Sequence, residues 1–407
     1  MPPDSSSSLQ GRGIPLWLIM LAVLTAFGSL SIDMYLPSFS TIAHEFGVGI
    51  NMVQLTLASF LVGLALGQMF YGPLSDRYGR KPPLYFGIGI YVVVSAACVF
   101  VHSIESLIVL RFFQGLGACA GIIIPRAAIR DKMGAAGSAR AFSLLMLVFG
   151  LAPILAPFFG GLALQAWGWR SIFVILTVFG AGCLIAMHFI MEETLDRHQA
   201  KPLQLGRTLR QYLDLLRHPQ FIAYAVNGGL MQAAMFAYIA GAPFVLIELH
   251  GIAPEHFGYV FGANAVGLII FSQVNARLVR KHPLDYLLKR ALWVAAGVTA
   301  TMAVLIAAGA DSLAVVLIGF FGFTCSYGCI SPNVAAIALS EQGQQAGTAS
   351  ALMGTLQFGM SVLAGVGISI WHDGTALPLA IMMAVCTVGG LCLYLGVARR
   401  HGLKASS

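Results

Sequence analysis

Twelve long apolar runs are the feature that most constrains the fold of this chain. Each is close to the length of about 20 apolar residues that a helix needs to cross a bilayer. An outer-membrane barrel would instead show shorter segments of alternating character. The runs lie near residues 16–37, 52–72, 82–101, 105–125, 141–163, 171–191, 220–244, 256–276, 284–308, 312–334, 346–370 and 374–397. We therefore expect an all-α membrane protein with twelve transmembrane helices.

Composition supports the same fold class. Of the 407 residues, 58% are hydrophobic and only 10% are charged, whereas a soluble domain usually carries roughly 25% charged residues. Too little polar surface remains to cover a water-facing globule. The lipid bilayer is therefore an expected partner, and little of the chain is left for a soluble domain.

The basic residues follow a topological pattern. With the N-terminus in the cytoplasm, the cytoplasmic loops and tails hold 21 of the 23 Lys and Arg residues. The two exceptions are Arg111, inside an apolar run, and Arg170, in an outer loop. An excess of Lys and Arg in cytoplasmic loops is typical of membrane proteins. The net charge of +7 thus indicates two cytoplasmic termini rather than a surface that binds nucleic acid.

The chain divides at its longest polar stretch, Glu192 to Gln220. "RKPP" at Arg80 recurs as "RKHP" at Arg280, and "SLLM" at Ser143 recurs as "SALM" at Ser350, 207 positions on. These echoes indicate a duplicated six-helix unit, and the offset of 207 aligns Arg111 with Ile318. We predict a cytoplasmic tail at 1–15, a six-helix bundle at 16–191, a cytoplasmic linker at 192–219, a second bundle at 220–398 and a cytoplasmic tail at 399–407.

A single carboxylate interrupts the first apolar run, at Asp33 in "SLSIDMYLPSF", and Pro37 follows it where the helix is expected to bend. The fourth run carries the buried cation Arg111. Asp33 and Arg111 lie roughly 14 and 9 Å below the outer face, at about 1.5 Å per residue. Ionisable groups at such depth are costly and usually functional. We interpret Asp33 as a proton site, the alternative being a structural partner that neutralises Arg111.

The loop after the second run reads "GPLSDRYGRK". Glycine allows a tight turn and a close helix approach, and a carboxylate is favourable near the N-terminus of a neighbouring helix. The pattern resembles the signature loop of the major facilitator superfamily, although a basic loop that serves topology alone is the alternative. We predict a gating loop of Gly72, Asp76, Arg77, Gly79 and Arg80.

Two further helices carry motifs. "RFFQGLG" around Arg111 is similar to the fourth-helix motif of the same superfamily, in which the arginine is associated with proton coupling; a snorkelling Arg111 is the alternative. "GLAPILAPFFGG" ends in a sequence that resembles the antiporter motif of drug exporters, with Ala156 where glycine is usual. Proline bends a helix and glycine lets helices pack closely. The antiporter helix is predicted from Gly150, Pro153, Pro157, Gly160 and Gly161.

The first half as a whole resembles the Bcr/CflA group of bacterial drug-resistance transporters, through "SIDMYLPSF", "GPLSDRYGRKP", "WGWRSIF" and "EETL". The resemblance implies a proton-coupled antiporter in the bacterial inner membrane. Its expected substrates are small, largely apolar drugs, similar to bicyclomycin or chloramphenicol, exported by alternating access between two six-helix halves. We expect Asp33, Gln114, Met146 and Tyr238 to line the substrate cavity.

Other classes of function are less compatible with the sequence. A proton symporter or facilitator for a metabolite, amino acid or peptide is the alternative transporter, but more polar groups would be usual in its second half. No phosphate-binding G-x-x-x-x-G-K-[ST] run is present, and the ten His and seven Cys residues are scattered. We expect no enzyme, no cofactor and no metal, and we expect a monomer.

Overall fold

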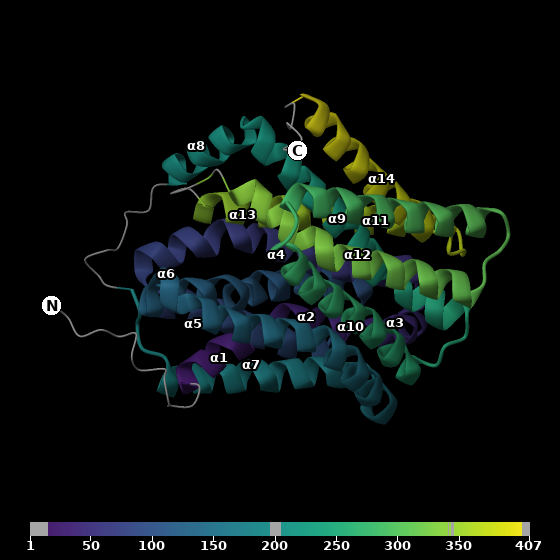
Figure 1. Ribbon diagram of the computed structural model, residues 1–407. Helices are drawn as coiled ribbons and strands as arrows, with labels where there is room; N and C mark the ends of the chain where they lie inside the picture. Colours follow the sequence, from purple (N-terminus) through teal and green to yellow (C-terminus); the bar gives the residue numbers. More distant parts are fainter. Residues whose placement is uncertain (1–14, 196–204, 341, 343–345, 401–407) are drawn as a thin grey trace.

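The computed structural model describes residues 15–195, 205–340, 342 and 346–400. These ranges form helices joined by short turns and contain no strand, which confirms the all-α fold class (Figure 1). The elements are α1 (Leu16–Leu24), α2 (Phe27–Asp33), η2 (Leu36–Ser38), α3 (Phe39–Phe46), α4 (Ile50–Tyr78), α5 (Lys81–Val99), α6 (Ile104–Trp167), α7 (Arg170–Ile190), α8 (Leu205–Leu216), α9 (Pro219–Pro243), η4 (Phe244–Leu249), α10 (Pro254–Leu278), α11 (Leu284–Ala307), α12 (Leu313–Leu339), α13 (Ala346–Ile370) and α14 (Leu377–Arg400).

The number of membrane spans agrees with the sequence. Among the described residues, eleven helical segments are long and apolar enough to cross a membrane, and the bent segment from Leu16 to Phe46 makes a twelfth. We call the side that holds Gly79 and Arg80 the loop side, and the opposite side the far side.

The first span is broken where the sequence is least regular. Helix α1 and the segment Phe27–Phe46 meet at an angle of 40° around Thr25 and Ala26, where the Thr25 hydroxyl donates to the Ala22 carbonyl at 2.6 Å. Such back-bonding is known to bend helices. The predicted bend at Pro37 takes another form, because Pro37 lies in a 3₁₀ turn that follows the end of α2 at Asp33.

The fourth and fifth spans belong to one continuous helix, α6. A straight helix of 64 residues would be about 96 Å long, yet Arg111 near its start contacts Ser31 and Gly160 near its end packs on Met34. The two ends therefore lie side by side, and α6 folds back between its spans. The two predicted spans at 105–125 and 141–163 are both present, as Ile104–Met133 and Gly150–Trp167, and helical hydrogen bonding continues through the residues where the chain reverses.

Two pairs of helices join the halves of the chain. Helices α4 and α13 pack together, as do α6 and α10, and Figure 1 shows the early and late helices gathered into two groups. On the far side, the Ser369 hydroxyl donates to the Asn51 carbonyl at 2.9 Å. A Cβ atom on Gly161 would lie 3.1 Å from the Pro254 carbonyl oxygen, so this pair packs backbone to backbone.

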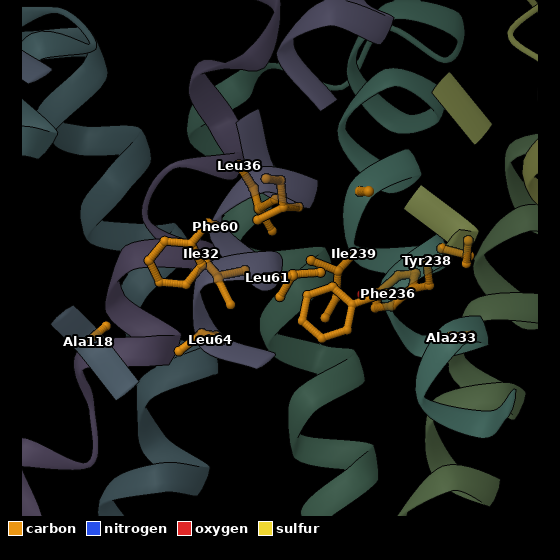
Figure 2. Packing of buried hydrophobic residues seen from close by; sticks show 14 of the residues in the cluster. Ile32, Leu36, Phe60, Leu61, Leu64, Ala118, Ala233, Phe236, Tyr238 and Ile239 are labelled. Carbon is orange, nitrogen blue, oxygen red and sulfur yellow. The ribbon is translucent and has the colours of Figure 1, made fainter. Parts of the chain in front are cut away.

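The core continues between these pairs. Ile32, Leu36, Phe60 and Leu61 of the first half and Ile239 of the second belong to one buried apolar cluster (Figure 2). At its far-side edge, the Gln54 amide donates to the Ala240 carbonyl at 3.2 Å. The structure is thus closed on the far side by contacts between the first and second halves.

Arg170, the one basic residue expected in an outer loop, has a structural role. Its guanidinium donates to the Val99 and Val101 carbonyls at 3.2 and 3.1 Å and pairs with Glu45. Glu45 also accepts from the Trp169 indole at 2.5 Å. These bonds tie the far-side end of the first span to α5 and α7.

Candidate functional site

Asp33 is a buried carboxylate at the junction of the two halves. It is the last residue of α2, and its side chain is only 4% exposed. The ion pairs formed among the described residues do not include it. The preceding residue, Ile32, belongs to the same buried apolar cluster as Ile239 of α9 in the second half (Figure 2). Asp33 is therefore the point where charge, burial and the interface between halves coincide.

Tyr238 stands in an aromatic setting that sequence reasoning missed. Its ring stacks on Phe261 at a centroid distance of 5.4 Å and meets the edge of Phe320 at 4.8 Å. Asn264 donates to its hydroxyl at 2.9 Å. The signal available in the sequence was an amide, Asn264, within an apolar run. The result is a phenol held in one orientation within the second half.

Arg111 lies inside the first half and is fully buried. Its guanidinium donates to Gln114 at 2.6 Å and to the Ser31 carbonyl at 3.0 Å. It also sits over the rings of Tyr35 and Phe60 at 4.6 and 4.5 Å, within the range of a cation–π interaction. Arg111 thus contacts α2 at Ser31, two residues before Asp33. The Asp33 and Arg111 side chains do not form an ion pair.

The duplication predicted from sequence needs a correction at this position. Ile318, which the offset of 207 aligns with Arg111, is 71% exposed. Phe320 instead contacts Tyr238, much as Arg111 contacts Tyr35. The apolar sequence offers several similar alignments, and burial selects the one in which Phe320 corresponds to Arg111.

The three other predicted cavity residues have different surroundings. Gln114 is fully buried, accepts from Arg111 and donates to the Ser95 hydroxyl at 2.7 Å. It therefore orients Arg111 within the bundle and is not brought to Asp33. Tyr238 is 1% exposed and packs against Phe261 and Phe320 within the second half. The side chain of Met146 lies outside the described residues.

The predicted gating loop is held within the first half. Arg80 is 3% exposed and donates to Asp76 at 2.6 Å, to Asp131 of α6 at 2.7 Å and to Ser75 at 2.8 Å. Burial alone would lower the pKa of Arg80, but the bonds and charges of Asp131 and Asp76 raise it above its usual value. Arg80 therefore remains a permanent cation that ties α4 to α6.

Glu193 fixes the turn of the same loop. Its carboxylate accepts from the backbone N–H groups of Arg80 and Lys81 at 2.8 and 3.1 Å. Gly79 between the helices has a φ of +95°, which favours glycine, and a Cβ there would lie 2.5 Å from the Glu193 carboxylate. Arg77 is exposed, and a Cβ on Gly72 would meet no atom within 4 Å.

The predicted antiporter helix is the second span of α6. It contacts both its own half and the second half of the chain. A Cβ on Gly160 would clash with the backbone of Met34, the residue after Asp33. The next residue, Gly161, packs on Pro254 of α10. A Cβ on Gly150 would lie 3.2 Å from the side chain of Ile269, which is also in α10. The glycines thus let one helix contact the Asp33 segment and the other half of the chain.

The two prolines of this helix have different exposure. Pro157 is buried and Pro153 is partly buried. The backbone of Pro157 and Phe158 lies against Gly258, where a Cβ would be 2.8 Å from Phe158. The prolines therefore occur where α6 runs along α10.

Comparisons with known proteins agree with this geometry. Residues 21–365 match the family model of the Major Facilitator Superfamily. The chain is 33% identical over 387 residues to the uncharacterized MFS-type transporter YdgK of Bacillus subtilis (strain 168), covering 94% of this chain and 95% of the relative. It is 30% identical to a bicyclomycin resistance protein homolog of Haemophilus influenzae, covering 96% and 98%.

More distant relatives and solved structures extend the comparison. The multidrug transporter MdfA of Escherichia coli O157:H7 is 26% identical, with 88% of this chain and 87% of the relative covered. Among solved structures, a peptide transporter in complex with alafosfalin has a TM-score of 0.77 at 15% identity, covering 96% of each chain. A D-xylose-proton symporter has a TM-score of 0.73 at 14% identity, covering 95% and 97%. These two likenesses concern the fold.

The matched family model, the relatives that cover nearly the whole chain and the helical fold all point to a transporter and not to an enzyme. The chain is a multi-pass membrane protein and belongs to the major facilitator superfamily.

Proposed function

We propose that this protein is a proton-coupled antiporter that exports small, largely apolar drugs from the cytoplasm. The observation that carries the proposal is Asp33, a carboxylate 4% exposed at the interface of the two halves. The names of the relatives support drug export, since one is a bicyclomycin resistance protein homolog and others are multidrug transporters. The positive-inside pattern supports a loop side in the cytoplasm, with both termini there, and the bacterial relatives support the inner membrane.

In this mechanism, Asp33 carries the proton. A buried carboxyl is costly as an anion unless it is paired or reached by water. Opening of the far side would separate Gln54 from Ala240 and admit water and protons to Asp33. Closure of the far side, as in this structure, would leave the cytoplasmic side as the route for proton release and substrate entry.

Arg111 has the chemistry to assist release. Its Nε atom is buried and lacks a hydrogen-bond partner among the described residues, which costs about 1–3 kcal/mol. A shift of α2 that brought the Asp33 carboxylate to this N–H would pair both groups. Arg111 of α6 already donates to the Ser31 carbonyl of α2. A small shift between α2 and α6 would therefore let Arg111 exchange this carbonyl for the Asp33 carboxylate.

Tyr238 and its neighbours are suited to the substrate. The rings of Tyr238, Phe261 and Phe320 form an apolar group in the second half, which we propose lines the same cavity as Asp33. Pockets that bind small molecules are mostly apolar with a few placed polar groups. Substrate bound here would contact Asp33 and residues of the second half at once, and would compete with the proton for the same site.

Reconstitution in liposomes tests the proposal. Purified protein is placed in vesicles containing a pH-sensitive dye, and bicyclomycin or chloramphenicol is added under a drug gradient. Antiport predicts proton movement opposite to the drug, whereas a symporter would move both in one direction. No drug-dependent proton movement would contradict the proposal.

The variant Asp33→Asn should abolish proton movement while the protein remains in the membrane at normal amounts. Glu248→Gln is the matched control, because Glu248 is an exposed carboxylate on the far side. Normal antiport in Asp33→Asn at equal protein amounts would show that this carboxylate is not the coupling group.

A further inference from the structure

Helix α8 lies in the linker between the two halves and has no part in the site described above. It follows Glu193, which is bonded to the signature loop, so α8 is on the loop side. It packs against α13 and α9. Figure 1 shows it at the margin of the bundle, beside the start of α13.

One face of α8 is used for packing inside the protein. Tyr212 is 7% exposed and Leu215 is 3% exposed. Leu213 and Leu216, by contrast, are 48% and 40% exposed. Two large aliphatic side chains thus remain uncovered on a helix that already buries its apolar face.

The arrangement around the helix is ordered. At 3.6 residues per turn, the positions run in the order Tyr212, Leu216, Leu213, Arg217 and Arg210. Both arginines are exposed. The uncovered leucines therefore lie between the buried face and the cationic face. Asp214 is the one exposed acid next to the arginines.

This order of side chains matches an interfacial helix. Such helices place leucines at the boundary of the acyl chains and arginines at the headgroups, and arginine stems can reach past apolar contacts to place the charge in water. Anionic headgroups on the cytoplasmic surface attract basic segments next to membrane helices. We propose that α8 binds anionic lipid headgroups of the leaflet on the loop side, through Arg210 and Arg217, with Leu213 and Leu216 at the acyl boundary.

The position of α8 gives the lipid an influence on the interface between halves. Helix α13, which α8 contacts, packs on α4 of the first half. A Cβ on Gly354 of α13 would lie 2.5 Å from the Gln68 side chain of α4. Because α8 packs on α13, a lipid that holds α8 also restrains α13 where it contacts α4.

Lipid retention by the full-length protein tests the proposal without measuring transport, so its outcome is separate from that of the proposed antiport. Protein in detergent is titrated with phosphatidylglycerol or phosphatidylethanolamine, and bound lipid is counted by native mass spectrometry. The wild type should retain phosphatidylglycerol in preference. The double variant Arg210→Gln/Arg217→Gln should bind it roughly 30-fold more weakly, since each arginine near an anionic surface contributes about fivefold.

The matched control is Arg277→Gln/Arg280→Gln, which removes two exposed arginines from the same side of the molecule but not from α8. It should weaken phosphatidylglycerol binding clearly less than the α8 double variant does. Equal lipid binding by the two double variants would overturn the proposal.

A second double variant tests whether Leu213 and Leu216 contact lipid. It also tests whether a second copy of the chain covers them instead. Leu213→Ser/Leu216→Ser should weaken phosphatidylglycerol binding several-fold while the melting temperature in detergent stays unchanged. Light scattering on the same samples reports the oligomeric state. Loss of a dimer with unchanged lipid binding would assign this face to a second copy of the chain and overturn the lipid proposal.

Discussion

The two halves of the molecule build the same contact with different chemistry. In the first half, the Arg111 guanidinium lies over Tyr35 and Phe60. In the second half, the Phe320 ring contacts Tyr238, which stacks on Phe261. In each half a residue of the fourth span meets a tyrosine of the first span, and a phenylalanine of the second span completes the group. The difference is a cation in one half and a ring in the other.

The two groups also differ in their polar contacts. Arg111 is joined by Gln114, Ser95 and the Ser31 carbonyl, whereas the second half adds one amide, Asn264, to its aromatic group. A buried cation must keep its hydrogen bonds, while rings pack without them. The first half is thereby suited to respond to charge, and the second half to provide an apolar surface.

The strongest test of this comparison converts one half into the other. Arg111→Phe places in the first half the residue type found in the second. We expect drug transport to fall at least a hundredfold, because the network around Ser31 and Gln114 loses its cation. Export from vesicles, normalised to protein amount, measures the effect. Phe320→Leu is the control, and a comparable loss in that variant would show that the two positions do not differ in function.

The signature loop offers the next largest effect. Arg80 is 3% exposed and bonded to two carboxylates, whereas Arg280, its counterpart in the repeat, is exposed. Arg80→Gln should lower the free energy of unfolding by about 2–3 kcal/mol, since hydrogen bonds to a charged group are lost. Arg280→Gln should change it by less than about 0.5 kcal/mol. Thermal unfolding in detergent compares the two, and equal effects would contradict the assignment of Arg80 as a structural tie.

A smaller effect is expected where glycines meet neighbours in each half. Gly160 faces the backbone of Met34, whereas Gly229 faces the flexible end of the Met360 side chain. Gly160→Ala should destabilise the protein by about 1–3 kcal/mol through overpacking, because backbone atoms cannot turn aside. Gly229→Ala should cost less, since a methionine side chain can rotate. Melting temperatures of the two variants, measured in one detergent, decide whether the backbone contact is as tight as described.

The smallest effect concerns the single amide of the aromatic group. Asn264→Leu removes the 2.9 Å bond to Tyr238 and should cost about 1 kcal/mol of stability. It should also alter substrate preference, since Tyr238 loses the bond that fixes its hydroxyl. Relative transport of bicyclomycin and chloramphenicol measures this. An unchanged ratio would place Tyr238 outside the substrate path.

The fold was largely predictable from the sequence. Twelve spans, the all-α class and the membership in the superfamily follow from apolar runs and from the residues 72–81, because these signals are local in the chain. The broken first span was predicted only in part. Pro37 predicted an interruption of the helix. The 40° bend at Thr25 and Ala26 was not predicted, because it accompanies the hydrogen bond from the Thr25 hydroxyl to the Ala22 carbonyl, which has no distinctive sequence pattern.

The site was less predictable, since its contacts join distant residues. The depth argument for Asp33 and Arg111 gave their relative level but not the direction of the guanidinium, which the Ser31 carbonyl and Gln114 determine. Gln114 was expected in the substrate cavity because it is polar and lies one turn from Arg111, and the structure bonds it to Arg111 and Ser95. Arg111 was aligned with Ile318 because the offset of 207, which matches Ser143 to Ser350, was applied to it, whereas Ile318 is exposed and Phe320 is buried.

The paired glycines of α6 have a consequence for how the halves can move. Gly160 lies against the segment that carries Asp33, and Gly161 lies against α10 of the second half. Neither position has a side chain to compress, so main-chain atoms alone set the distance across α6 at this level. The halves cannot come closer there without displacing backbone. Under the proposed function this fixed level would serve as the pivot between the halves, and a proton-linked change at Asp33 would act one residue away from the Gly160–Met34 contact.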